Sequence, residues 1–361
     1  MKKICFFSGD ITRGGGTESV AVLIANALAE QKKYEILFLS LVEQRDTPFF
    51  SIDPGIKRYH LGEKWIQPGP GYLIVLPKLK RFLKEQGVDV LVDIDIVLDI
   101  LALPVRRSSG IKVISWGHFS YYFEQESLYR RLIMKICTKK ADYCVTINEE
   151  NRCCYEKYLH RSKAVKTIYN PAVCGERREN VSKEKYIFWV GRLVEIKGVD
   201  YLAETADLVL KKLPQWKWLV AGDGEEREWL ESYITEHKLE GRLVLLGRVD
   251  DLQQYYERAE IYVLTSHSEG LPMCLLEAKS YELPCVSFNI HTGPKEIIRD
   301  GVNGYLVEPY NCKKLAEKIV KLAEDEILRK QFAQKTSLDK EKFDLKYILY
   351  SWNEVFKSLC G

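Results

Sequence analysis

The stretch SHSEGLPMCLLEAKSYELPCVSF, residues 266–288, connects two apolar runs through a short segment of helical character. The run IYVLT precedes it, and the stretch closes in the run LPCVSF; both runs have the length of strands. Glu269 and Glu277 stand eight positions apart between them. Strand, helix and strand within so few residues is typical of a βαβ unit with parallel strands. Ligands bind parallel sheets beyond the carboxyl ends of the strands, which is where Glu269 is expected.

The same alternation fills both halves of the chain. In the first half, strands are expected at 2–9, 34–42, 89–96, 112–117, 141–148 and 164–171, and helices at 19–31 and 77–86. In the second half, strands are expected at 186–193, 216–224, 243–249, 260–266 and 283–288, and helices at 199–213, 226–237, 252–259 and 272–281. The pattern predicts an α/β fold of two Rossmann-like domains that face a central cleft.

A polar stretch, CGERRENVSKEK at 174–185, divides the two halves and is expected to be a linker. The predicted domains therefore span 1–173 and 186–342. The tail at 343–361 has the pattern of an amphipathic helix, which is expected to cross back and pack on the N-terminal domain.

Composition is that of a globular protein: 361 residues, 46% hydrophobic and 29% charged. No apolar run reaches the roughly 18–20 residues of a membrane span, and the first residues do not form a secretory signal. A cytoplasmic location is therefore expected. The ten cysteines are scattered and form no CxxC pair, which favours reduced, buried thiols over disulfides or a metal cluster.

Charge is unevenly spread along the chain. Residues 1–171 carry 26 Lys and Arg against 19 Asp and Glu, a net +7, whereas the rest carries a net −4. The first half is thus the better candidate to meet an anionic partner. Its segments 77–86 and 129–143 are basic and apolar at helical spacing. They lie either on an anionic membrane surface or, as ordinary amphipathic helices, on the sheet. No nucleic-acid-binding motif is present.

The opening stretch also suggests a ligand. Pro272 suits a first helical turn, so Met273 and Cys274 would present unpaired backbone N–H groups to an anion. A carboxylate accepts two hydrogen bonds at once, which suits a sugar diol. Glu269, these amides and Glu277 together outline a site for a nucleotide sugar. The alternative is that both glutamates are simply solvated.

Six segments carry a resemblance to a known family. They are GGGTESVAVLIANAL (14–28), IYNPAV (168–173), VGRLVEIKG (190–198), AGDGEEREWL (221–230), the stretch at 265–288 and TGPKEIIRDGVNGYLVEP (292–309). In this order and spacing the chain resembles glycosyltransferase family 4. Members of that family are retaining enzymes of the GT-B fold, here of the bacterial polysaccharide type. The resemblance implies that 1–173 binds the acceptor and 186–342 the nucleotide sugar.

The resemblance also implies roles for single residues of the second half. Glu269 would hold hydroxyls of the donor sugar and act in catalysis, and Glu277 would hold the ribose diol. Arg192 and Lys197 would neutralise the diphosphate. The remaining residues implied to bind the donor are Gly270, Met273, Cys274, Thr292 and Gly293.

In the first half, Gly15 and Gly16 open a helix directly after the first strand. Glycine there would let the backbone approach a ligand closely or adopt positive φ. His118 follows the strand at 112–117. The resemblance implies that it lines the donor sugar and assists catalysis; the alternative is a structural histidine.

Asp93 and Asp95 form a DxD, the metal-binding signature of the other large transferase fold, GT-A. Here they alternate with Val92, Ile94 and Ile96, as the two faces of a strand do. They are interpreted as solvent-facing carboxylates at a strand end. No metal and no other cofactor is expected.

The implied reaction moves a hexose or N-acetylhexosamine from a nucleoside-diphosphate sugar, preferably a UDP-sugar, to an acceptor hydroxyl with retention. The acceptor would be a carbohydrate or a lipid-linked saccharide, and the protein would lie in the cytoplasm or peripherally at the inner face of the plasma membrane. Two alternatives are a nucleotide-sugar 2-epimerase of the same fold and a non-catalytic nucleotide-sugar-binding protein. The glycine loop does not read GxGxxG, which disfavours a dinucleotide site.

Overall fold

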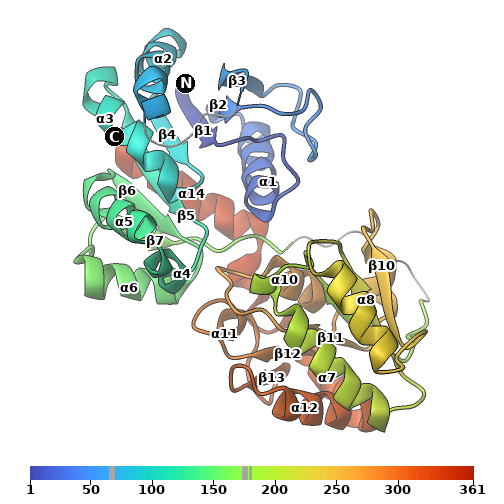
Figure 1. Cartoon of the computed structure of the whole chain (residues 1–361). Coiled ribbons are helices and arrows are strands. Elements are labelled where there is room, and N and C mark those ends of the chain that lie inside the picture. The colour runs from blue at the N-terminus through green and yellow to red at the C-terminus, as the bar shows by residue number, and fades with distance from the viewer. Residues whose placement is uncertain (65–69, 173–177, 179–180) are drawn as a thin grey trace. The chain divides into compact units, whose positions relative to one another are not determined.

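The computed structural model describes residues 1–64, 70–172, 178 and 181–361 (Figure 1). The chain divides into two compact units: unit 1 is Met1–Pro171 with Lys342–Gly361, and unit 2 is Ala172–Glu341. Of the predicted linker, residues 174–177, 179 and 180 lie outside the described residues. Each unit is a parallel sheet with helices on both faces, so the prediction of two Rossmann-like α/β domains is confirmed.

Unit 1 has a seven-stranded sheet in the order β3-β2-β1-β4-β5-β6-β7, and every pair of neighbours is parallel. Its strands are β1 (Lys2–Ser8), β2 (Tyr34–Val42), β3 (Lys57–Gly62), β4 (Val90–Asp93), β5 (Lys112–Gly117), β6 (Tyr143–Thr146) and β7 (Val165–Thr167). Its helices are α1 (Gly16–Glu30), α2 (Pro70–Gln86), α3 (Asp99–Ser109), α4 (Tyr121–Glu126), α5 (Leu128–Lys140), α6 (Glu149–Leu159) and α14 (Leu345–Cys360).

Unit 2 has a six-stranded parallel sheet in the order β10-β9-β8-β11-β12-β13. Its strands are β8 (Tyr186–Val190), β9 (Lys217–Ala221), β10 (Leu243–Gly247), β11 (Ile261–Leu264), β12 (Cys285–Phe288) and β13 (Gly304–Val307). Its helices are α7 (Val199–Lys212), α8 (Arg227–Glu236), α9 (Gln253–Arg258), α10 (Met273–Ser280), α11 (Pro294–Ile297), α12 (Cys312–Glu324) and α13 (Glu326–Gln334).

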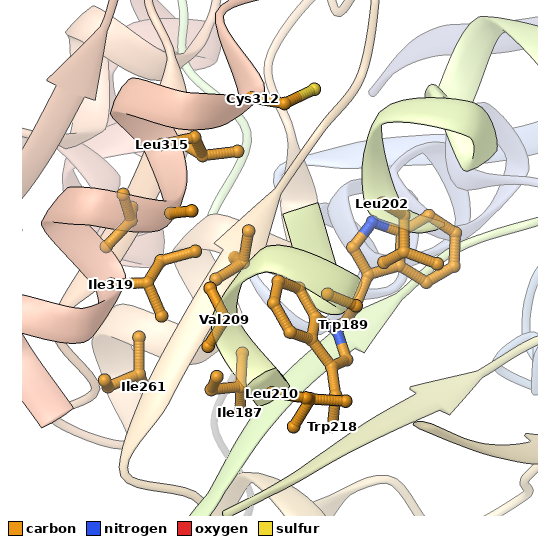
Figure 2. Close-up of a cluster of buried hydrophobic side chains, with 14 of the residues drawn as sticks. Ile187, Trp189, Leu202, Val209, Leu210, Trp218, Ile261, Cys312, Leu315 and Ile319 are labelled. Atoms are coloured by element: carbon orange, nitrogen blue, oxygen red, sulfur yellow. The ribbon is translucent and has the colours of Figure 1, made fainter. Parts of the chain in front are cut away.

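The strands read as continuous apolar runs because helices cover both faces of each sheet. On one face of the unit 2 sheet, Trp189 and Trp218 pack with side chains of α7 and α12 (Figure 2). On the other face, Phe188 packs against Tyr256 of α9, at 5.1 Å between ring centroids. This alternation along β8 leaves only the strand ends and their loops to meet a ligand.

The C-terminal helix belongs to unit 1, as the fold prediction requires (red in Figure 1). Trp352 of α14 is fully buried. Its ring lies 4.9 Å from that of Trp116 on β5 and 6.4 Å from that of Phe6 on β1. Burial of large aromatic surface therefore fixes the last helix to the first sheet.

The interpretation of the DxD as solvent-facing carboxylates is wrong for Asp93. β4 ends at Asp93, and because helices cover both faces of this central part of the sheet, that side chain is fully buried. It interacts with the buried carboxyl of Asp99, which also accepts a 2.5 Å hydrogen bond from Ser115. Asp95 is half-buried and caps a 3₁₀ turn, Ile96–Leu98, by accepting from the N–H of Val97 at 3.1 Å.

Other local predictions also needed correction. The helix expected at 77–86 begins at Pro70, so that Pro77 lies inside it, at an exposed position. Gly15 and Gly16 have negative φ, so positive φ is not the reason for glycine there. The prediction also missed eight helices and strands: β3, α3, α4, α6, α11, β13, α12 and α13.

The nine described cysteines are all free thiols, and six of them are buried. Cys153 is exposed. In the described part of the chain, no helix is long and apolar enough to cross a bilayer.

Candidate functional site

The strand order of unit 2 determines where a ligand can bind. β8 and β11 are parallel neighbours at the centre of the sheet. From β8 the chain continues to β9 on one side, and from β11 it continues to β12 on the other side. At such a reversal the loops after the two strands diverge and leave a crevice beyond their carboxyl ends. The loop after β8 carries Arg192 and Lys197, and the loop after β11 carries Glu269. The sheet thus brings together residues that are about 70 positions apart in the sequence, at the place where a Rossmann fold binds its ligand.

Lys197 and Glu269 form an ion pair, with 2.6 Å between Nζ and Oε1. Ser266 also donates to this Oε1, at 2.7 Å. Burial lowers the pKa of Lys197, but the attraction of Glu269 outweighs it, so the pKa is raised and the side chain stays cationic. Among the described residues, none donates to Oε2 of Glu269. The carboxylate is therefore anchored by one oxygen and can accept hydroxyl groups with the other.

The backbone holds the two loops against each other. The N–H of His267 donates to the carbonyl of Ile196 at 2.9 Å, and Thr265 Oγ1 donates to the carbonyl of Lys197 at 3.1 Å. Gly198 has φ 63°, and a Cβ there would collide with the carbonyl of Thr265. Glycine is thus required for the approach that places Lys197 beside Glu269.

α10 begins at Met273, with Pro272 as its N-cap residue. No described residue accepts from the N–H of Met273 or Cys274, while the next two N–H groups bond to the carbonyl of Pro272. Two free N–H groups and the positive end of the helix dipole favour an anion here. The expected phosphate site therefore has the necessary donors.

The loop before α11 closes this end of the site. Thr292 donates through Oγ1 to the carbonyl of Glu269. Gly293 has φ 97°, and a Cβ on it would lie 2.7 Å from Cδ of Pro272 and 3.3 Å from the carbonyl oxygen of Gly270. The structure therefore brings Thr292 and Gly293 to the loop that carries Glu269 and Gly270.

Glu277 lies in a different environment from Glu269. Its Oε2 accepts a 2.8 Å hydrogen bond from the phenol of Tyr256 on α9. Burial raises the pKa of Glu277, and the bond from Tyr256 only partly offsets this. Burial also raises the pKa of the neighbouring Cys274 thiol to about 12, so the thiol stays protonated. Glu277 is thus a half-buried acceptor held by a neutral donor.

Arg192 is exposed and lies close enough to Lys197 to disfavour its charge. The two cations repel each other, and Lys197 is stabilised by Glu269. An anion bound between them would relieve this repulsion. Arg192 and Lys197 therefore lie where the neutralisation of an anion was expected.

The remaining predicted site residues lie in unit 1. Gly15 caps α1 after β1, and Gly16 has open space where a Cβ would lie. His118 follows β5, and its ring lies 4.3 Å from that of Trp116. It is buried, and burial lowers its pKa to about 3, so the imidazole is neutral. Its Nε2 has no partner among the described residues, so it can still make one hydrogen bond.

Sequence reasoning missed Ser266 and Tyr256. Ser266 precedes Glu269 by three residues within the opening stretch, and its hydroxyl was a usable signal. Tyr256 is 21 positions before Glu277, and no spacing or motif connects them. In the described part of the chain, no cluster of three His, Cys, Asp or Glu side chains could hold a metal ion.

The second half of the chain, residues 176–338, matches the family described as "Glycosyl transferases group 1". Over 356 residues the chain is 31% identical to an uncharacterized glycosyltransferase of Haemophilus influenzae, covering 98% of this chain and 100% of that one. The chain belongs to the group 1 glycosyl transferases. The matched region holds the Lys197–Glu269 pair and Glu277, and unit 1 has its counterpart in the relative.

Two further comparisons place this glycosyl transferase among bacterial relatives. It is 25% identical to a Campylobacter jejuni alpha-1,4-N-acetyl-D-galactosaminyltransferase that acts on an undecaprenol-diphosphate-linked saccharide, covering 98% and 97% of the two chains. A variant of S. aureus TarM, solved with fondaparinux, alpha-GlcNAc-glycerol and UDP, superimposes with a TM-score of 0.80 at 16% identity, covering 99% and 100%. At that identity the likeness shows the shared fold, which is GT-B.

Proposed function

We propose that this glycosyl transferase moves a hexose or N-acetylhexosamine from a UDP-sugar to an acceptor hydroxyl, with retention at the anomeric carbon. One observation carries the proposal: Glu269 and Glu277 are held differently at one sheet edge, with free helix N–H groups between them. Glu269 would accept from hydroxyls of the donor sugar, and Glu277 from the ribose. The amides of Met273 and Cys274 would receive phosphate oxygens.

In this mechanism, the bond from the anomeric carbon to the diphosphate breaks and the acceptor oxygen takes its place on the same face. The acceptor's proton passes to the departing phosphate. Arg192, Lys197 and the N-terminus of α10 stabilise the charge that develops on the diphosphate. His118 is neutral, so it serves as a hydrogen-bonding group to the sugar and not as an acid. Gly16 would leave room for the ligand near the start of α1, whereas the Glu18 carboxylate fills the space beside Gly15.

For the acceptor, we propose a lipid-linked saccharide or polysaccharide precursor. The name of the Campylobacter relative supports this choice, since its substrate is carried by a polyprenyl diphosphate. The excess of cations in the first half of the chain would suit both a diphosphate and an anionic membrane. The enzyme would then work in the cytoplasm, peripherally at the inner face of the plasma membrane.

The donor is tested by calorimetric titration of the full chain with UDP, GDP and ADP. UDP is expected to bind and the other two to bind more weakly. Binding of GDP or ADP in preference to UDP would replace the proposed donor. No binding of any nucleotide would contradict the site itself.

The reaction is tested with UDP-sugars and a soluble surrogate acceptor. The product is expected to keep the anomeric configuration of the donor, as read from its proton coupling by NMR. Incubation of donor alone separates the alternatives: an epimerized sugar would indicate a 2-epimerase, and no turnover with any acceptor would indicate a binding protein.

Activity is expected to persist in EDTA because protein cations and helix amides supply the charge stabilisation. Loss of activity in EDTA with recovery on addition of manganese would contradict this account of the leaving group. An assay after removal of EDTA on a desalting column is the control for damage to the fold.

A further inference from the structure

Helix α5 has an apolar stripe that nothing in the described structure covers. Ile133, Met134 and Cys137 form its buried face, which packs into unit 1. Leu128 and Leu132 follow a four-residue spacing that continues to Ile136, so the three share another face. Leu128 is 74% exposed and Leu132 59%. Packing on the sheet therefore accounts for one apolar face of α5 and leaves the second unexplained.

The first turn of α2 extends this stripe. Leu73 is 72% exposed and Ile74 66%. The preceding residue, Tyr72, lies close enough to Tyr129 of α5 for the two phenol groups to interact. That contact places the exposed start of α2 beside the exposed start of α5. We call the combined set the α2–α5 surface; its apolar members are Leu73, Ile74, Leu128, Tyr129, Leu132 and Ile136.

Cations flank the α2–α5 surface. α5 contains five basic residues and no acidic one, and Lys135, Lys139 and Lys140 are exposed. On α2, Lys78 and Arg81 are exposed one and two turns beyond Ile74. Lysine and arginine beside a helical apolar stripe can hold their charges at a lipid headgroup layer while the stripe enters it. A protein partner would require acidic groups set at matching positions, whereas anionic lipids supply mobile ones.

We propose that the α2–α5 surface docks unit 1 on an anionic membrane, with Leu73, Ile74, Leu128 and Leu132 inserted between the headgroups. The exposed leucines supply the apolar area and the lysines supply the electrostatic attraction. The proposal gives a defined surface to the peripheral location put forward above.

The surface also reaches a predicted site residue. Arg130 of α5 lies over the rings of Phe119 and Phe123, at 5.3 and 5.7 Å from their centroids. Phe119 directly follows His118 and is itself part-exposed. A lipid-linked saccharide held in the membrane would therefore be delivered on the side of unit 1 that carries His118. This last step rests on the proposed function.

Co-sedimentation of the full chain with phosphatidylcholine vesicles, with and without phosphatidylglycerol, tests the docking. Binding is expected only with phosphatidylglycerol, and it should weaken as salt rises because exposed charges are screened within about 8–10 Å at physiological ionic strength. Leu128→Ser with Leu132→Ser should weaken it about tenfold or more, since two apolar side chains no longer leave water. Ile327→Ser is the matched control: Ile327 is 72% exposed, but lies on α13 in unit 2.

A second variant tests the charges. Lys135→Gln with Lys139→Gln should weaken binding on the order of tenfold and flatten its salt dependence, because each lysine near an anionic surface contributes separately. Native-like binding by both double variants would overturn the proposal. So would a native chain that binds neither kind of vesicle. Sedimentation velocity provides a further check: if the native chain is a dimer that Leu128→Ser with Leu132→Ser makes monomeric, and no vesicle binds, the surface joins two copies of the chain.

UDP affinity, measured on the same preparations, separates this proposal from the proposed function. The docking variants should bind UDP as the native chain does, since none of the changed residues lies in unit 2. A chain that binds vesicles and no nucleotide would keep the docking surface and contradict the transferase site. A chain that binds UDP and no vesicle would keep the transferase site and contradict the docking surface.

Discussion

Glu269 and Glu277 have the same functional group and different partners. Glu269 is held by a cation, Lys197, whereas Glu277 is held by a neutral phenol, that of Tyr256. A diphosphate would compete with Glu269 for Lys197, so nucleotide binding would release the carboxylate toward the sugar. Removing the charge of one residue is therefore expected to affect UDP affinity and turnover differently from removing the charge of the other.

Glu277→Gln should weaken the binding of UDP by about tenfold to a hundredfold, because a hydrogen bond to a charged group is worth about 1.5–3 kcal/mol. Glu269→Gln should leave UDP affinity unchanged or slightly higher, since Lys197 loses its competing partner. Its turnover of UDP-sugar should nevertheless fall sharply, because contacts that strengthen in the transition state appear in kcat. Calorimetry with UDP and initial rates distinguish the two. Equal losses of UDP affinity in both variants would contradict the assignment.

Asp93 is a second residue whose environment determines its behaviour. Burial and the neighbouring Asp99 raise the pKa of Asp93 well above its usual value. A carboxyl whose pKa is raised on folding contributes its full stability below the unfolded pKa of about 3.9, and that contribution is lost as pH rises toward the folded pKa.

Asp93→Asn is neutral at every pH, so it should raise the melting temperature at pH 7, and the gain should shrink toward pH 4. The expected slope is at most about 1.4 kcal/mol per pH unit. Asp46→Asn, at an exposed position, is the control and should show no such trend. A melting temperature lowered at pH 7 would mean that the interaction with Asp99 outweighs the cost of burial.

At the scale of elements, short loops position the site. The loops after β8 and β11 are joined by backbone bonds, and the loop before α11 packs on the Glu269 loop through Gly293. Apart from a 3₁₀ turn at Glu195–Lys197, these loops contain no helix or strand, yet each is fixed by at least one close backbone approach. The site is therefore sensitive to a single added methyl group.

Gly293→Ala should reduce the turnover of UDP-sugar by about tenfold or more, because its Cβ would push Pro272 and Glu269 away and a positive φ adds strain of about 1–3 kcal/mol. Gly301→Ala is the matched control: it also has positive φ, at 69°, but a Cβ there would meet open space. It should lose some stability and keep its turnover. Equal turnover in the two variants would show that the packing of Gly293 does not set the geometry of Glu269.

At the scale of the whole molecule, the C-terminal helix α14 belongs to the same unit as the first residues of the chain. α14 contributes Trp352 to a cluster with Phe6 and Trp116, and Trp116 in turn lies against His118. The last residues of the chain thus support the first sheet and one of its predicted site residues.

Trp352→Ala should destabilise unit 1 by about 3–5 kcal/mol, since a large buried side chain is replaced by a cavity. Native-state hydrogen exchange checks this: protection should fall in β1 and β5 and stay unchanged in β8 and β11, which belong to unit 2. Tyr347→Ala, exposed on the same helix, is the control. A uniform loss of protection in both sheets would show that the two units unfold together.

The sequence by itself determined the two α/β domains, the amphipathic C-terminal helix and the identity of the residues around Glu269. These follow from local signals: apolar runs of strand length, helical spacing, and motifs whose residues lie within a few positions of one another. It also located Gly293 and Thr292, although not that they pack against the Glu269 loop.

Only the tertiary structure decided which groups are covered. Alternation along 89–96 is the same whether one face of a strand is solvated or both are covered, so the burial of Asp93 depended on the helices that pack on both faces of the sheet. The partnership of Tyr256 with Glu277 joins two helices whose contact no spacing encodes. In α5, periodicity marks two apolar faces equally, and the packing of Ile133 and Met134 decides that Leu128 and Leu132 are the pair left outside. Burial is a property of the neighbours that a residue acquires on folding, and a linear pattern does not contain them.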